Sequence, residues 1–176
     1  MYQLGADPRV AKSQLPPGRA GTRATLQTMQ RLAQDGARDV TVREAAVGIV
    51  RAAGIVGHDF DGEIRALYEY VRDRIRFTRD MDRVELLQGA RYTLEHGFGD
   101  CDDKATLLAA LLGSIGHRAG IKLRAIGTGG DGFSHVYPVV SAAGRTLALD
   151  ATHADTALGW EYPHPSQTMD VPVWPT

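Results

Sequence analysis

The sequence has very little cysteine, no long apolar run and no excess of charge of either sign. Its 176 residues include one cysteine, Cys101, so no disulfide can form within the chain, as is typical of a reducing compartment. No stretch of 18 apolar residues is present, so we expect no membrane span and no membrane partner. The 20 basic and 21 acidic residues balance, which gives no reason to expect a nucleic-acid partner. The first residues lack the basic and apolar regions of a signal peptide, so we expect a cytoplasmic protein.

The spacing of glycine, proline and apolar residues divides the chain into four stretches. Residues 1–21 hold three prolines and few large apolar groups, which predicts an extended arm. Residues 22–58 have apolar residues at helical spacing and predict an N-terminal helical segment. Residues 59–160 are the expected core of the protein. Residues 161–176 carry prolines and aromatic residues and predict a coil tail on the surface.

Local signals predict where two helices and one loop begin. Thr41, with Glu44 three positions later, matches a capping box at the start of a helix. Asp59 precedes a further stretch with an apolar stripe at helical spacing, and we expect it to open that helix. Residues 77–96 begin with a polar run and show no clear period, so they predict a surface loop that leads toward Cys101.

The stretch Gly97-Phe98-Gly99-Asp100-Cys101-Asp102-Asp103-Lys104 joins a turn to a leucine-rich run that predicts a helix ending near Ile115. Cys101 therefore lies near a helix N-terminus, where free N–H groups and the helix dipole favour an anion such as a thiolate. Asp102 and Asp103 oppose thiolate formation, so the direction of the pKa shift of Cys101 stays open. We interpret both aspartates as favourable first-turn carboxylates, with a role next to the thiol as the alternative.

After this helix the apolar period changes from helical to alternating. Residues 121–125, 133–140 and 146–149 predict three strands at the spacing of hairpins, and therefore a small antiparallel sheet. Helices followed by such a sheet indicate a single α+β domain, in which the helix that carries Cys101 packs on the sheet.

Three residues have the types and the order that nucleophilic catalysis by a thiol requires. Cys101 begins a helix, His135 lies early in the second predicted strand, and Asp150 closes the third. A cysteine nucleophile needs a base, and the base needs a group that orients it. A single cysteine before a helix is otherwise most often a small buried hydrophobic residue. The same three side chains could bind zinc, but no paired ligand spacing supports this, so we expect no metal and no cofactor.

These motifs resemble those of the transglutaminase-like branch of the papain-type cysteine enzymes. The resemblance covers roughly residues 60–160, and residues 88–159 resemble the compact members found in phages and prophages. The stretches that carry it are Gly99-Asp100-Cys101-Asp102-Asp103, Ser114-Ile115-Gly116, Ser134-His135-Val136 and Leu149-Asp150-Ala151-Thr152, with residues 70–77 as the lead-in.

The resemblance implies acyl transfer at an amide through a thioester, with Cys101 as nucleophile, His135 as base and Asp150 as its orienting group. We expect a cysteine-dependent amide hydrolase acting on a protein or peptide, with a transglutaminase and a non-catalytic binding module as alternatives. A phage structural protein is one candidate partner, and a phage-encoded protein would act in the bacterial host cytosol. Further candidates for the oxyanion site or its lining are Gln88, Tyr92, Asp102, Ser134 and His153.

Overall fold

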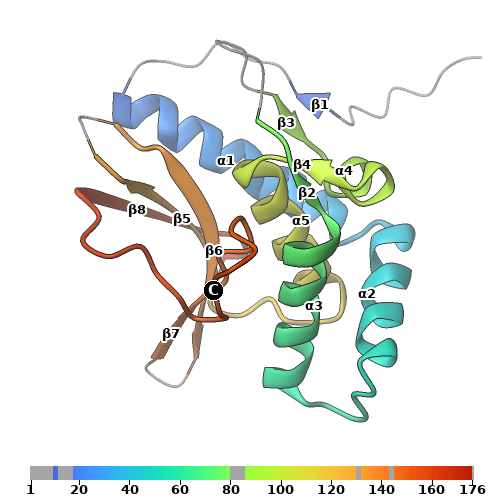
Figure 1. Ribbon diagram of the computed structural model, residues 1–176. Coiled ribbons are helices and arrows are strands. Elements are labelled where there is room, and N and C mark those ends of the chain that lie inside the picture. The colour runs from blue at the N-terminus through green and yellow to red at the C-terminus, as the bar shows by residue number, and fades with distance from the viewer. Residues whose placement is uncertain (1–9, 12–17, 80–85, 130–131, 143–144, 176) are drawn as a thin grey trace, which may run out of the picture.

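The computed structural model describes residues 10–11, 18–79, 86–129, 132–142 and 145–175 (Figure 1). The helices are α1 (Gly18–Gly36), α2 (Val40–Ala52), α3 (Phe60–Arg74), α4 (Ala90–His96) and α5 (Cys101–Ser114). The strands are β1 (Val10–Ala11), β2 (Arg76–Phe77), β3 (Leu87–Gln88), β4 (Phe98–Gly99), β5 (Ile121–Gly127), β6 (His135–Ala142), β7 (Arg145–Ala148) and β8 (Gln167–Pro172). Figure 1 shows α5 between the sheet of β5 to β8 and the helices α2 and α3, which confirms the predicted α+β class.

The central helix α5 begins at Cys101 and runs to Ser114, as the sequence predicts. From Asp103 onward every residue of the helix is buried, because α5 packs against the other four helices and against β6. A helix that is covered on all sides has no polar face, which explains its leucine-rich and alanine-rich composition. The core cluster around it draws residues from α1 as well as from β8, so the N-terminal helices share one core with the sheet.

The N-terminal helices begin at different residues from those predicted. Helix α1 starts at Gly18, so the last four residues of the predicted arm are helical; Thr22 lies inside the helix and donates its hydroxyl to the Gly18 carbonyl at 3.5 Å. Helix α2 is capped by Asp39, whose carboxylate accepts from the N–H of Thr41 at 2.8 Å. The predicted capping box at Thr41 is therefore wrong, because a better N-cap acceptor stands two residues earlier. The predicted start at Asp59 agrees with α3, which Asp59 caps.

The main sheet has four strands in the order β7-β6-β5-β8, all antiparallel. Three of them are the predicted strands. The fourth, β8, lies in the stretch predicted to be a coil tail, so that prediction is wrong. Strand β8 pairs with β5 and buries Met169 and Val171. Its short alternating pattern lies between prolines, which conceal the period of a strand.

Helix α1 and the end of β8 are bonded to each other through side chains. The Gln30 amide donates to the Pro172 carbonyl at 2.8 Å, and the Gln34 amide donates to the Val173 carbonyl at 2.6 Å. The first helix and the last strand therefore hold each other in place beside α5.

The segment that precedes Cys101 is held by backbone hydrogen bonds. Strand β4, which ends one residue before Asp100, pairs in parallel with β2 at the end of α3. The Arg76 N–H donates to the Gly97 carbonyl at 2.8 Å, and the Thr78 N–H donates to the Gly99 carbonyl at 3.0 Å. The predicted surface loop over residues 77–96 instead contains β3 and the helix α4, with buried residues in both. Residues 80–85 of that stretch lie outside the described part of the chain.

Within the described residues, no helix combines the length and the apolarity that crossing a membrane requires.

Candidate functional site

Cys101 is the first residue of α5, and the preceding residue caps that helix. The Asp100 carboxylate accepts from the N–H groups of Asp102 at 2.9 Å and Asp103 at 3.2 Å, and Asp103 bonds back to the N–H of Asp100 in a capping box. Gly99 is required here, because a Cβ at this position would lie 2.5 Å from the Asp103 Cβ. The turn thus sets the backbone at Cys101 through short-range bonds that the sequence motif encodes.

The electrostatic surroundings of Cys101 favour the protonated thiol. Burial is the largest cause, and the carboxylates of Asp102 and Asp100 add to it, so the pKa of the Cys101 thiol lies well above its ordinary value. The Asp102 carboxylate accepts from Sγ at 3.5 Å. A hydrogen bond with the backbone of Val136 acts in the opposite direction and favours the thiolate. Because Asp100 already occupies two N–H groups of the first turn, the helix N-terminus does not by itself make Cys101 acidic.

His135 and Asp150 form a directly bonded pair at one end of the main sheet. His135 is the first residue of β6, and Asp150 follows β7, which is the neighbouring strand. Nε2 of His135 lies 2.7 Å from Oδ2 of Asp150. Burial raises the pKa of the Asp150 carboxyl, but the bonds from His135 and from the Thr152 N–H outweigh it, so the pKa lies below its ordinary value. The pair is therefore built to keep a carboxylate against the imidazole.

The Cys101 thiol interacts with the strand that carries His135. Sγ of Cys101 is hydrogen-bonded with the backbone of Val136, the residue that follows His135. Helix α5, which begins at Cys101, packs on β6, which carries His135 and Val136. Since Asp150 occupies Nε2 of His135, Nδ1 is the ring nitrogen that remains to take a proton from the thiol.

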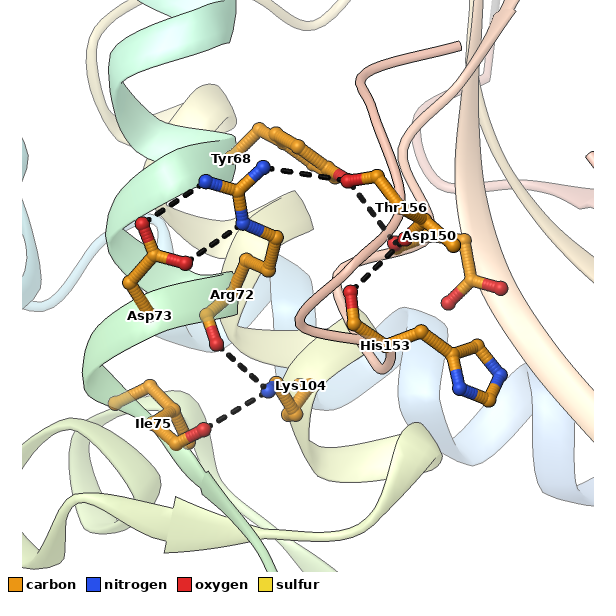
Figure 2. Close-up of polar contacts among 8 residues, drawn as sticks. All are labelled: Tyr68, Arg72, Asp73, Ile75, Lys104, Asp150, His153 and Thr156. Atoms are coloured by element: carbon orange, nitrogen blue, oxygen red, sulfur yellow. Dashed lines mark hydrogen bonds and ion pairs between the residues drawn. The ribbon is translucent and has the colours of Figure 1, made fainter. Parts of the chain in front are cut away.

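The loop after Asp150 is fastened to α3. The Tyr68 hydroxyl, fully buried, donates to the carbonyls of Asp150 at 3.3 Å and Thr156 at 3.0 Å, as Figure 2 shows. Arg72 also donates to the Thr156 carbonyl, at 3.2 Å, and the Thr156 hydroxyl donates to the His153 carbonyl at 2.9 Å. The backbone that carries Asp150 is therefore held by a helix more than 80 residues away in the chain.

A buried lysine lies between this helix and Asp150. Lys104 is 2% exposed, and its Nζ donates to the carbonyls of Ile75 at 2.8 Å and Arg72 at 3.4 Å (Figure 2). Burial lowers the pKa of Lys104 to about 8, while the carboxylates of Asp150 and Asp73 act to raise it. At neutral pH the lysine therefore remains mostly charged, and it supplies positive charge to the region that holds the Asp150 carboxylate.

The two candidates for a second oxyanion donor are engaged elsewhere. The Gln88 backbone N–H donates to the Asp103 carboxylate at 2.8 Å, and its side-chain oxygen accepts from Thr93 at 3.4 Å. The Tyr92 ring stacks on His96 with centroids 3.9 Å apart. Within the described residues, neither side chain is hydrogen-bonded to Cys101. Their roles as oxyanion donors remain predictions.

The remaining three candidates differ in how close they lie to the pair. Asp102 contacts Cys101 directly, as described above. Ser134 closes the turn before β6, with its hydroxyl 2.7 Å from that of Thr128. The His153 ring lies beside His135, with centroids 5.8 Å apart, and against Trp160 on the other side.

The sequence predicted Cys101, His135 and Asp150 as site residues but did not predict the side chains that support them. Asp100 as the N-cap was recognisable from its place before the helix. Tyr68 reads as an ordinary apolar position of α3, and Lys104 reads as a surface lysine in the first turns of α5. The bonds of both residues are long-range, so no local pattern could have indicated them.

Two groups of side chains bring ligand-type atoms together within the described residues. One is His135, Asp150 and His153, and the other is Asp100, Cys101 and Asp102; in each group the possible ligand atoms lie within 4.8 Å of one another. In the second group, the Asp100 carboxylate caps α5 and the Asp102 carboxylate accepts from Cys101.

Comparison with models of known protein families gives a match. Residues 56–138 match the model of the transglutaminase-like superfamily core. The matched stretch contains Cys101 and His135 and ends twelve residues before Asp150. A comparison of the sequence with curated proteins finds no match.

Proposed function

Because residues 56–138 place the chain in the transglutaminase-like superfamily, we propose that it is a cysteine-dependent hydrolase of amide bonds in a protein or peptide substrate. The observation that carries the proposal is the 2.7 Å bond between His135 Nε2 and Asp150 Oδ2. This bond orients a base on β6, the strand that also holds Val136, whose backbone interacts with the thiol of Cys101, the only cysteine of the chain.

In the proposed first step, Sγ of Cys101 attacks the amide carbon while Nδ1 of His135 accepts the thiol proton. A protonated resting thiol requires this coupled transfer, in place of a thiolate that exists beforehand. The Asp150 carboxylate stabilises the imidazolium through Nε2. The backbone N–H of Cys101 is the natural donor to the oxyanion.

In the second step, the carbon–nitrogen bond breaks and the leaving amine takes the proton from Nδ1, which leaves a thioester on Cys101. Water then attacks the thioester carbonyl and gives a proton to His135. The tetrahedral intermediate collapses to the free acid, and the thiol regains its proton. An amine in place of that water would give a new amide, which is the transglutaminase alternative.

An activated ester tests this chemistry without knowledge of the natural substrate. Acyl transfer from p-nitrophenyl acetate to Cys101 would release nitrophenolate in a burst of one equivalent per chain, with one acetyl group on the protein by intact mass. We expect no burst in Cys101→Ser. We expect a burst slower by about 10²–10⁴-fold in His135→Ala, the range of general acid–base contributions. His58→Ala, which replaces an exposed histidine, is the matched control and should behave as wild type.

The same experiment distinguishes the alternatives. Titration of a small primary amine into the acetylated protein measures whether the acetyl group goes to water or to the amine; dominant acetamide product would favour a transglutaminase. Equal rates in wild type and His135→Ala would contradict the proposed base. Absence of any burst in wild type would leave a binding module on the same fold as the better interpretation.

A further inference from the structure

His153 is a histidine beside the catalytic pair that the proposed reaction does not use. Its ring lies 5.8 Å from that of His135 between centroids. Its carbonyl is fixed by the Thr156 hydroxyl, and Figure 2 shows the ring below the Asp150 carboxylate. Among the described residues, its side chain makes ring contacts but no hydrogen bond. A polar ring held next to a histidine–aspartate pair is therefore available for a ligand.

We propose that His135, Asp150 and His153 form a binding site for a divalent transition metal, with Zn²⁺ as the best-matched ion. Two imidazoles and one carboxylate are the ligand types that zinc prefers, and three protein ligands leave one position for water. The possible ligand atoms of the three residues already lie within 4.8 Å of one another.

The three ligands differ in how far they would have to move. His135 and Asp150 are in contact at 2.7 Å. Tetrahedral zinc with bonds of about 2.0–2.2 Å separates its ligand atoms by roughly 3.3 Å. Closing from at most 4.8 Å to that separation requires a small shift, and His153 is the member best able to make it, since it is partly exposed and lies on a loop.

The second group of ligand-type atoms fits zinc less well. Asp100, Cys101 and Asp102 offer no imidazole, and the Asp100 carboxylate already accepts two backbone N–H groups of α5. A metal there would compete with the cap of a buried helix. The histidine site involves no helix cap.

Metal at the histidine site would stop the proposed reaction through the tautomer of His135. A neutral imidazole carries one proton, which in the resting pair lies on Nε2 and points to Asp150. With Nε2 bound to metal, that proton moves to Nδ1, so Nδ1 cannot accept the thiol proton. The site would then act as a reversible off-switch that needs no contact between the metal and Cys101. This consequence rests on the proposed function, whereas the binding itself does not.

The binding is tested on the Cys101→Ser protein, which lacks the thiol as a competing ligand and cannot form a thioester. Zinc sulfate is titrated in by isothermal titration calorimetry, and Co²⁺ is used as a spectroscopic substitute whose d–d bands report coordination by nitrogen and oxygen. We expect one saturable site per chain. His153→Ala should weaken it by at least about tenfold, since even loss of an outer partner costs 10–100-fold in affinity. His58→Ala replaces another exposed histidine and should leave the affinity unchanged.

The outcomes separate this proposal from the proposed function. Absence of saturable zinc binding to the Cys101→Ser protein would overturn the metal site, whatever the catalytic result. An unchanged zinc affinity when His153→Ala is added to Cys101→Ser would overturn it as well. If the site binds zinc and the wild type shows an ester burst, zinc should suppress the burst, EDTA should restore it, and His153→Ala should resist the suppression. A burst that zinc at saturation leaves unchanged would overturn the switch and keep the site.

Discussion

Asp103 and Asp150 are both almost completely buried, with 1% and 2% of their surface exposed, yet the fold uses them in different ways. Asp103 lies under the first turn of α5 and accepts from two backbone N–H groups, those of Gln88 at 2.8 Å and Asp100 at 3.3 Å. Asp150 lies at the end of the main sheet, where one oxygen meets the His135 ring and the other accepts from the Thr152 N–H at 3.1 Å.

The difference teaches that burial of a carboxylate does not identify a functional site, whereas the kind of partner does. The backbone N–H groups of Gln88 and Asp100 cannot change their charge, so their bonds to Asp103 stabilise the turn that holds Cys101. A histidine partner can gain or lose a proton, so Asp150 can influence a reaction. The first region sets where the nucleophile lies, and the second sets the state of its base.

The largest effect is expected from Asp150→Ala. The His135 ring would lose the carboxylate that orients it through Nε2, and we expect the ester burst to slow by about 10²–10⁴-fold, the range of general acid–base contributions. Stopped-flow absorbance of nitrophenolate measures it. Asp155→Ala, an exposed aspartate in the same loop, is the control. A burst rate within a factor of two of wild type would remove Asp150 from the mechanism.

Asp103→Ala should lower the stability of the protein and affect the ester burst less than Asp150→Ala does. The N–H groups of Gln88 and Asp100 would lose their acceptor, and an unsatisfied buried donor costs about 1–3 kcal/mol. We expect the free energy of unfolding in guanidinium chloride to fall by about that amount. The folded fraction should keep a burst closer to wild type than that of Asp150→Ala. Asp61→Ala, at an exposed first-turn position of α3, should change the free energy of unfolding little. An equally large loss of stability in Asp61→Ala would contradict the stabilising role of Asp103.

Tyr68→Phe is a milder test of how the Asp150 loop is held. The change removes only the hydroxyl that bonds the carbonyls of Asp150 and Thr156, so we expect a loss of about 0.5–1.5 kcal/mol in unfolding free energy and a slower burst. Tyr70→Phe is the matched control on the same helix, since the described structure gives its hydroxyl no hydrogen bond. Identical burst rates in the two variants would mean that the Tyr68 bonds do not position Asp150.

The smallest effect is a pH dependence of stability that belongs to Asp150. Its folded-state pKa is lowered, so its ionised form stabilises the fold above the unfolded pKa of about 3.9. That contribution is lost as the pH falls through the lower, folded value. The difference in unfolding free energy between wild type and Asp150→Asn should therefore shrink below about pH 4. A difference that stays constant from pH 7 to pH 3 would contradict the lowered pKa.

Much of the site's framework could be predicted from sequence because its signals are local. The cap and the leucine-rich run place Cys101 at a helix start. Alternation places His135 on one strand and Asp150 just after the neighbouring strand, which ends at Ala148 in the structure. The pairing of β8 with β5, by contrast, depends on contacts about 45 residues apart, such as Leu123 with Val171. Tyr68 and Lys104 could not be assigned for the same reason: their hydrogen bonds join α3 and α5 to backbone far away in the chain.

The bonds from Gln30 and Gln34 to the end of β8 have a mechanical consequence. A force that pulls the first helix and the last strand apart would load these two bonds and the β5–β8 ladder, together with the packing of α1 on α5. Cys101, His135 and Asp150 all lie between those two elements along the chain. Tension applied at α1 and β8 would therefore be shared between these bonds and the helix that begins at Cys101.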